Sequence, residues 1–153
     1  MSYWDWAVAE HGRPGVDAAL TGLQDEHGQC VAYLLWAAWT AAEGRPLKPS
    51  TLAAGAALAA EWEAAATNPL RHARRALKPA LPPIADAARE ALREQVRKAE
   101  FAAERLLMET LEAMAPVAGG RGETLSGALI AASNAWNTAA PAVALNDLAK
   151  MLS

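Results

Sequence analysis

The chain has 153 residues and a formal net charge of −3, which fits one domain with a buried core. This slightly acidic balance excludes a molecule that attracts nucleic acid over its whole surface. The 40 alanines, set against six valines and two isoleucines, favour helices and argue against a sheet. The single cysteine, Cys30, excludes an intramolecular disulfide.

The beginning of the chain, MSYWDWAVAE, has neither a basic segment nor a long apolar run, so we expect no signal peptide. No stretch of about 20 apolar residues occurs anywhere, which is the length that a membrane-spanning helix needs. We therefore expect a cytoplasmic protein without membrane insertion.

Two helices are predicted before the central part of the chain. Ser2 is a good N-cap for a helix over about Tyr3 to His11, which a glycine-rich turn ends. The second helix runs to about His27, because Gly28 follows it at a C-cap position.

The stretch from Gln29 to Glu43 is the centre of the predicted fold. Almost every residue from Cys30 to Ala42 is apolar. A helix that is hydrophobic on all sides has no face for water, and this one is too short to span a membrane. We therefore predict that the helix at 29–43 is buried inside a bundle.

The following segments predict an alanine-rich helix from Ser50 to about Ala66 and a separate helix from Asn68-Pro69 to near Lys78. A long amphipathic helix is predicted over 83–115, about 48 Å in length at 1.5 Å per residue. This exceeds a compact domain of this size, so the helix must kink or project, and a projecting helix commonly pairs with a second copy. Its predicted apolar seam consists of Ile84, Ala88, Ala91, Gln95, Ala99, Ala102, Leu106, Thr110 and Met114.

Residues 116–122 predict a flexible loop, and two short helices are expected after it, at about Thr124 to Thr138 and Ala140 to Leu152. Together these elements predict one all-α domain over residues 1–153, a bundle of about six to eight helices around the buried helix at 29–43.

The first half of the chain resembles a small bacterial family that is catalogued only as a domain of unknown function. The resemblance covers residues 3–78 and implies a helical fold and a bacterial cytoplasmic origin, but no activity. Members often carry Asp and Asn where this chain has Cys30 and Ala32, so a polar site at those two positions is not implied here. The residues that carry the resemblance are Trp4-x-Trp6-Ala7, Gly15-Val16, Leu23-Gln24-Asp25, Gly28, Val31, Leu34-Leu35, Trp39 and Pro69-Leu70-Arg71 with Arg74-Arg75 and Leu77-Lys78.

Four cations between residues 71 and 78 form the sharpest surface feature of the sequence. On a helix, Arg71, Arg74, Arg75 and Lys78 lie within an arc of about 100°. Such a face can bind an acidic protein partner, phosphate groups or the backbone of a nucleic acid. The alternatives are that acids from the first 67 residues cover this face, or that it is simply solvated.

The tryptophans suggest a second kind of site. Trp4, Trp36 and Trp39 can line an apolar ligand pocket. The alternative is that they fill the core, since each supplies a large volume where most neighbours are alanine.

Metal-binding and catalytic patterns are missing from the sequence. His11, His27, His72 and Cys30 lack the spacing of a zinc or di-iron site, so we expect no metal and no cofactor. No serine lies in a GxSxG context and no phosphate-binding GxxxxGK loop occurs, so no catalytic residue is assigned.

These observations favour a non-enzymatic interaction protein, an adaptor or regulator that presents the basic face to a protein partner. A homodimer through the long helix is a related hypothesis. The alternative function is a small-molecule or lipid-binding protein, or an enzyme, with a tryptophan-lined pocket. Nucleic acid is disfavoured as a partner because no aromatic residue lies between Trp62 and Phe101.

Overall fold

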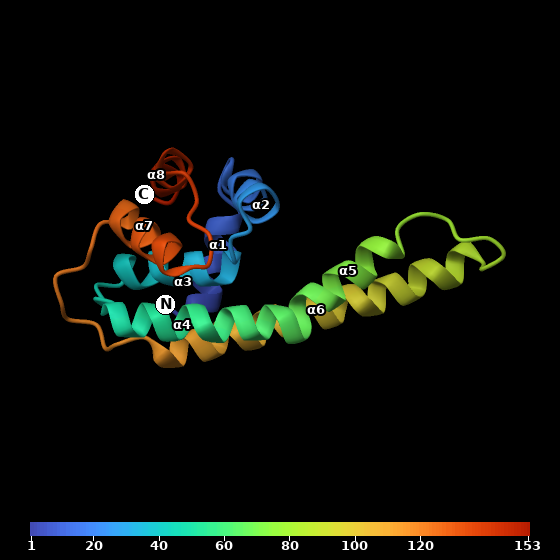
Figure 1. Cartoon of the computed structure of the whole chain (residues 1–153), viewed down its shortest axis with the longest axis horizontal. Helices are drawn as coiled ribbons and strands as arrows, with labels where there is room; N and C mark the ends of the chain where they lie inside the picture. The colour runs from blue at the N-terminus through green and yellow to red at the C-terminus, as the bar shows by residue number, and fades with distance from the viewer.

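The computed structural model describes residues 1–153 and contains helices without any strand (Figure 1). This confirms the predicted all-α fold. In chain order the elements are α1 (Tyr3–His11), α2 (Val16–His27), α3 (Val31–Ala42), α4 (Pro49–Trp62), the π-helical segment η1 (Glu63–Thr67), α5 (Asn68–Ala76), α6 (Asp86–Met114), α7 (Leu125–Ala135) and α8 (Ala142–Met151).

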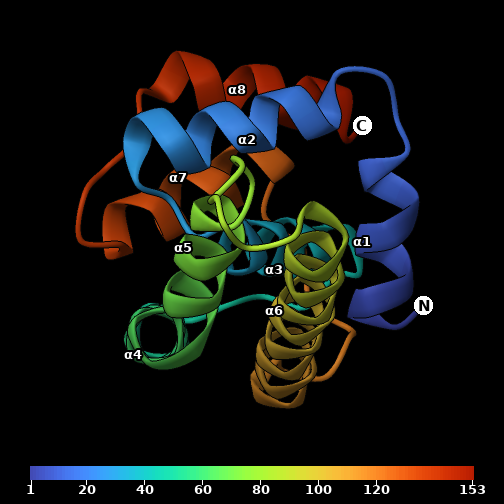
Figure 2. The ribbon, with the colours of Figure 1, turned by 90° about the vertical axis from the view of Figure 1, so that its right-hand side faces the viewer.

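Helix α3 lies at the centre of the body, as its sequence predicts. Its residues from Tyr33 to Thr40 are all buried, and it contacts α1, α2, α4, α6 and α7. Viewed along the long axis, α2 and α8 form an upper layer over α3 and α7, while α4 and α6 lie beneath and α1 lies at one side (Figure 2). No helix is both long and apolar enough to cross a membrane.

The expected glycine and serine caps of the first two helices are present. The Ser2 hydroxyl accepts a hydrogen bond from the Asp5 backbone N–H at 3.1 Å, which satisfies one free donor of the first turn. Gly28 ends α2 with a φ of 61°, a left-handed conformation that glycine adopts without a steric penalty.

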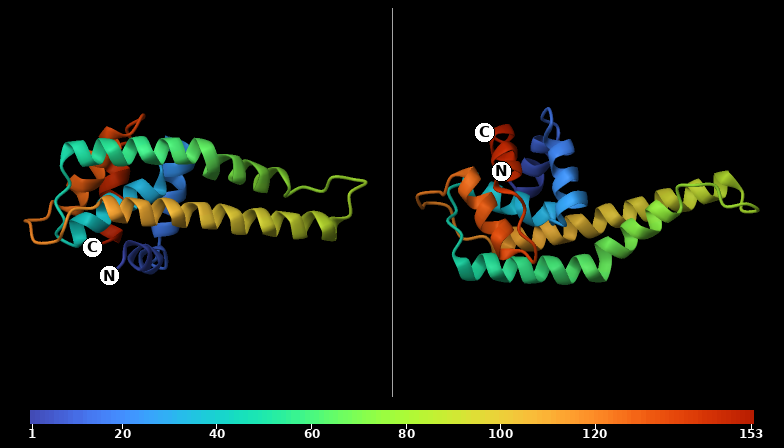
Figure 3. Two further views of the ribbon diagram at one scale, coloured as in Figure 1. Left: turned by 90° about the horizontal axis from the view of Figure 1, so that it is seen from below. Right: turned by 45° about the horizontal axis from the view of Figure 1, so that its top comes forward.

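Helices α4 and α5 form one continuous bent helix, so the predicted break before Asn68 is wrong. Between them, η1 widens the helix, and the Asn68 N–H donates to the carbonyl of Glu63, five residues back. The cause is Pro69, which has no N–H to donate and whose ring clashes with the carbonyl four residues before it. A π-turn removes this conflict without ending the helix, and the ribbon bends at this point (Figure 3).

Helix α6 projects beyond the body, as its predicted length requires. Helix α5 packs along the projecting part of α6, and the two form an arm with the loop that joins them (Figures 1 and 3). We refer to residues 71–98 as the arm.

The apolar seam predicted for α6 faces solvent, which corrects the sequence analysis. From Ala88 to Thr110, every residue of that seam is exposed. The buried face of α6 is displaced around the helix and consists of Arg89, Glu100, Ala103, Leu107, Met108 and Leu111. Two of these residues are charged and remain inside because ion pairs with neighbouring side chains satisfy them.

Candidate functional site

A pocket of about 400 Å³ lies between α1, α2, α3, η1 and α6, at the junction of the body and the arm. Most of its lining is apolar. Leu20 of α2 and Leu35 of α3 are buried beneath it, and Leu107 and Met108 of α6 close one side. The elements that build it come from both halves of the chain, so only the folded molecule contains this pocket.

Two aromatic rings lie side by side in the lining of the pocket. Trp4 of α1 and Phe101 of α6 meet edge to face, with ring centroids 5.1 Å apart and planes at 84°. Phe101 is 51% exposed although its ring borders an apolar pocket. The guanidinium of Arg105 lies 5.0 Å from the centroid of the Trp4 ring and covers one face of it.

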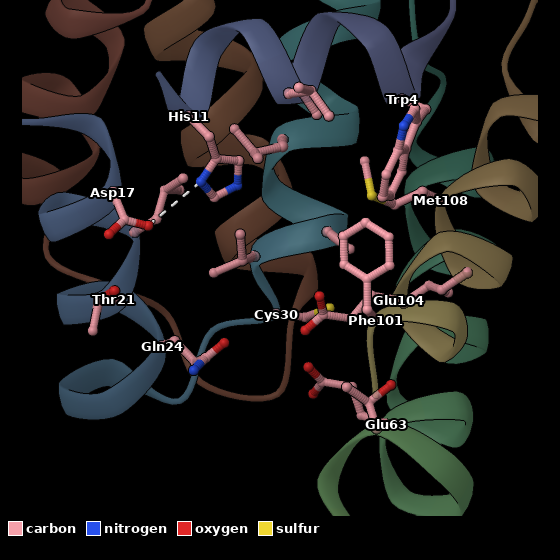
Figure 4. Close-up of a pocket in the computed structure, with 18 of the residues that line it drawn as sticks. Trp4, His11, Asp17, Thr21, Gln24, Cys30, Glu63, Phe101, Glu104 and Met108 are labelled. Carbon is pink, nitrogen blue, oxygen red and sulfur yellow. Dashed lines mark ion pairs between the residues drawn. The ribbon is translucent and has the colours of Figure 1, made fainter. Parts of the chain in front are cut away.

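Polar side chains enter the pocket from two opposite walls (Figure 4). Asp17, Thr21 and Gln24 lie along α2 on one wall. The carboxylates of Glu63 and Glu104 point into the pocket from the other wall. An apolar pocket with a few convergent polar groups is the usual form of a small-molecule site.

The π-helical segment supplies the base of the pocket. Glu63 is its first residue and Thr67 its last, and both line the pocket. Thr67 is only 2% exposed, and its hydroxyl oxygen has no hydrogen-bond partner. A buried hydroxyl without a partner costs free energy, and this one belongs to a residue that lines the pocket. Segments of π-helix are frequent at functional sites.

Glu63 and Cys30 lie together at this base. Burial raises the pKa of the Glu63 carboxyl, and hydrogen bonding with the Cys30 thiol only partly opposes this effect. Burial also raises the pKa of Cys30 well above its ordinary value, and the nearby Glu63 adds to this. The thiol therefore stays protonated at neutral pH, which makes it a poor nucleophile.

Glu104 differs from Glu63 in forming an ion pair, although Arg71 lowers the pKa of both carboxyls. Burial raises the pKa of Glu104, while Arg71 lowers it. The Arg71 Nη2 atom lies 3.3 Å from Glu104 Oε1, whereas Glu63 forms no ion pair. On the opposite wall, His11 Nδ1 lies 3.6 Å from Asp17 Oδ1.

Residues 2–111 match the family model described as Protein of unknown function (DUF2390). The chain belongs to this family. No curated protein and no solved structure matches the chain. The segment that matches the DUF2390 model includes every residue that lines the pocket, from Trp4 to Met108, and ends before α7.

The basic residues predicted as a partner-binding face of this DUF2390 member are mostly paired inside the molecule. Arg71 and Arg74 both bind Glu100 of α6, and Arg75 Nη2 lies 3.3 Å from Asp25 Oδ1. Lys78 is exposed and forms no ion pair. The acids over this face thus come mainly from α6, and Arg75 and Lys78 are the members that solvent reaches.

The three tryptophans proposed as a pocket are separated by the DUF2390 fold. Trp4 lines the pocket described here, but Trp36 and Trp39 are buried in the core, at 0% and 1% exposure. Trp36 packs directly on α4 at Gly55, where an added Cβ would lie 2.7 Å from the ring. Trp36 and Trp39 therefore fill the core, which was the alternative to a ligand pocket.

Sequence reasoning missed Glu63, Thr67, Phe101 and Glu104 as site residues. Glu63 and Thr67 have one sequence signal, Pro69 inside an otherwise continuous helical pattern, which marks the π-segment, whereas Phe101 and Glu104 have none. No three side chains of the His, Cys, Asp and Glu types come together in a way that could hold a metal ion.

Proposed function

We propose that this DUF2390 member is a small-molecule-binding protein and that the pocket between the body and the arm is its ligand site. One observation carries the proposal: a mainly apolar pocket of about 400 Å³ has, at its base, an unpartnered hydroxyl on Thr67 and a carboxylate on Glu63 that forms no ion pair. Its volume falls within the range of about 300–1,000 Å³ that ligand pockets occupy.

Binding of the neutral dye Nile red, followed by its fluorescence, tests this proposal. The variant Thr21→Phe places a ring into the pocket from an exposed position of α2. Ala18→Phe adds the same ring at an exposed position of the same helix that does not line the pocket. We expect saturable binding that Thr21→Phe abolishes and Ala18→Phe preserves. Equal binding by all three proteins would contradict the proposal.

A second candidate function is the predicted interaction role, and the outward face of α6 favours it. Helix α6 is rich in charged residues, yet one of its exposed faces carries no charge. This face lies about 100° around the helix axis from the buried face. We propose that a second copy of the chain packs on this uncharged stripe. The stripe consists of Ala88, Leu92, Gln95, Ala99, Ala102, Leu106, Thr110 and Ala113.

Charge complementarity points to a second copy in antiparallel orientation. The arm carries eight bases and three acids, whereas the rest of the chain carries six bases and fourteen acids. Antiparallel pairing along α6 would place the basic arm of one copy against the acidic body of the other.

Sedimentation velocity tests this second candidate. Leu106→Glu puts a charge into the stripe at a side chain that is 54% exposed, and Val143→Glu puts one at an exposed apolar residue of α8. We expect a concentration-dependent dimer that only Leu106→Glu dissociates. A wild-type chain that stays monomeric at high concentration would remove this candidate. We place either role in the bacterial cytoplasm, as the sequence resemblance implies.

A further inference from the structure

The polar groups at the base of the pocket lie apart from its aromatic surface, while His11, Asp17, Thr21 and Gln24 line the opposite wall, and this arrangement restricts the ligands that fit. Glu63, Thr67 and Glu104 lie at the base, where η1 meets α6. Trp4 and Met108 lie at the other end, beneath α1 (Figure 4). A ligand that fills this space must therefore join a polar head to an apolar body.

The charges at the base select the sign of that head. Three carboxylates line the pocket, from Asp17, Glu63 and Glu104. The only lining residue with a permanent positive charge is Arg71, and its guanidinium already binds Glu100, Glu104 and the side-chain oxygen of Asn68. The carboxylate of Glu63 forms no ion pair; the Cys30 thiol hydrogen bonds with it and Arg71 lowers its pKa, but burial outweighs both effects. An anionic head would be repelled by this carboxylate, whereas a cationic head would compensate its partly desolvated charge.

The hydrogen-bonding groups at the base select an amine among cationic heads. A protonated primary amine has three N–H donors. The base offers acceptors to match them, namely the carboxylate of Glu63 and the hydroxyl of Thr67, which has no partner in the protein. The Cys30 thiol, which is protonated, contributes little as an acceptor.

The other end of the pocket accommodates the body of the ligand and not its charge. The guanidinium of Arg105 already occupies the Trp4 ring as a cation–π partner. A second cation at this end would be repelled by Arg105. Trp4, Phe101 and Met108 instead offer aromatic and thioether surface, which suits an aryl or alkyl group.

We propose that the pocket binds a primary amine with an aromatic or alkyl body, and that Glu63 is the residue that recognises the ammonium group. This inference rests on the proposed function, because it assigns a ligand class to the same pocket. It predicts discrimination between ligands that share a body and differ only in the head.

Three probes with one body test the inference by isothermal titration calorimetry: 4-phenylbutylamine, 4-phenylbutanol and 4-phenylbutanoate. We expect the wild-type chain to bind the amine at least about tenfold more tightly than the alcohol, and the carboxylate most weakly. Glu63→Gln should reduce this preference to within about threefold while leaving the affinity for the alcohol unchanged. Glu61→Gln, at an exposed position of the same helix that does not line the pocket, should behave as the wild type.

The outcomes separate this inference from the proposed function. Equal affinities for the amine and the alcohol, or tightest binding of the carboxylate, would overturn the inference while Nile red binding still supports a small-molecule site. Binding of Nile red with no binding of any of the three probes would also overturn it. An amine preference that survives Glu63→Gln would remove Glu63 as the recognition residue. Failure of both Nile red and the amine would refute the proposed function itself.

Discussion

The buried carboxylate of Glu100 stabilises the junction between the arm and the body, and its removal should be costly. Glu100 is 7% exposed and accepts hydrogen bonds from both Arg71 and Arg74. Removing one partner of a buried ion pair costs about 3–5 kcal/mol, because the remaining charge stays desolvated. In Glu100→Gln, Arg71 keeps Glu104, and Arg74 is 25% exposed and regains some water. We therefore expect a loss of about 2–3 kcal/mol.

Thermal unfolding followed by circular dichroism measures this loss. For a chain of this size, about 2–3 kcal/mol lowers Tm by roughly 4–12 °C. The matched control is Glu109→Gln, since Glu109 pairs with Arg105 on the same helix but both side chains are about half exposed. Such a surface pair contributes less than about 0.5 kcal/mol. Equal Tm losses in the two variants would refute the reasoning that burial makes Glu100 important.

Three further predictions follow from burial and packing. Gly55→Ala forces a Cβ to 2.7 Å from the Trp36 ring, so it should cost about 1–3 kcal/mol by denaturant unfolding, whereas Gly22→Ala meets no atom within 4 Å and should be neutral or stabilising. Because burial raises the pKa of Glu63, its ionisation destabilises the fold as the pH rises. Glu63→Gln should therefore raise Tm at neutral pH, and this gain in Tm should fade toward pH 4.5. A gain in Tm that grows on acidification would contradict this. Cys30 should react with Ellman's reagent only after unfolding, since it is 2% exposed and its pKa is raised. Fast reaction of the native chain would contradict the burial of this thiol.

The elements governed by local chemistry were predictable. Helix α3 is buried because its sequence offers no polar face, and that property can be read without a structure. The ends of α1 and α2 follow from Ser2 and Gly28, whose capping roles depend only on their immediate neighbours. The positions of these helix ends can be predicted because they depend on neighbouring residues and not on distant ones.

The orientation of α6 was not predictable, because the apolar pattern misidentifies its buried face. Alanines and leucines recur at helical spacing on the side that faces solvent. The buried side includes Arg89 and Glu100, which enter the interior because the fold supplies opposite charges. A periodicity argument assigns polar residues to the surface and does not register their pairing.

The pocket could not be predicted for a different reason. Its walls come from segments as far apart in sequence as Trp4 and Met108, so no local motif contains it. The sequence did identify Arg71 and Trp4, but for separate sites. The fold brings them to one pocket and moves Trp36 and Trp39 away from it.

The orientation of the arm depends on how many residues the π-segment contains. A π-turn holds one residue more than an α-turn, so deleting one residue from Glu63–Thr67 can be absorbed by a return to α-helix, whereas inserting one would rotate everything after it by about 100° relative to α4. The guanidiniums of Arg71 and Arg74 would leave Glu100, and the base of the pocket would turn away from α6. Substitutions on this five-residue segment leave the orientation of the arm unchanged, whereas an insertion there changes which face of the arm contacts the rest of the molecule.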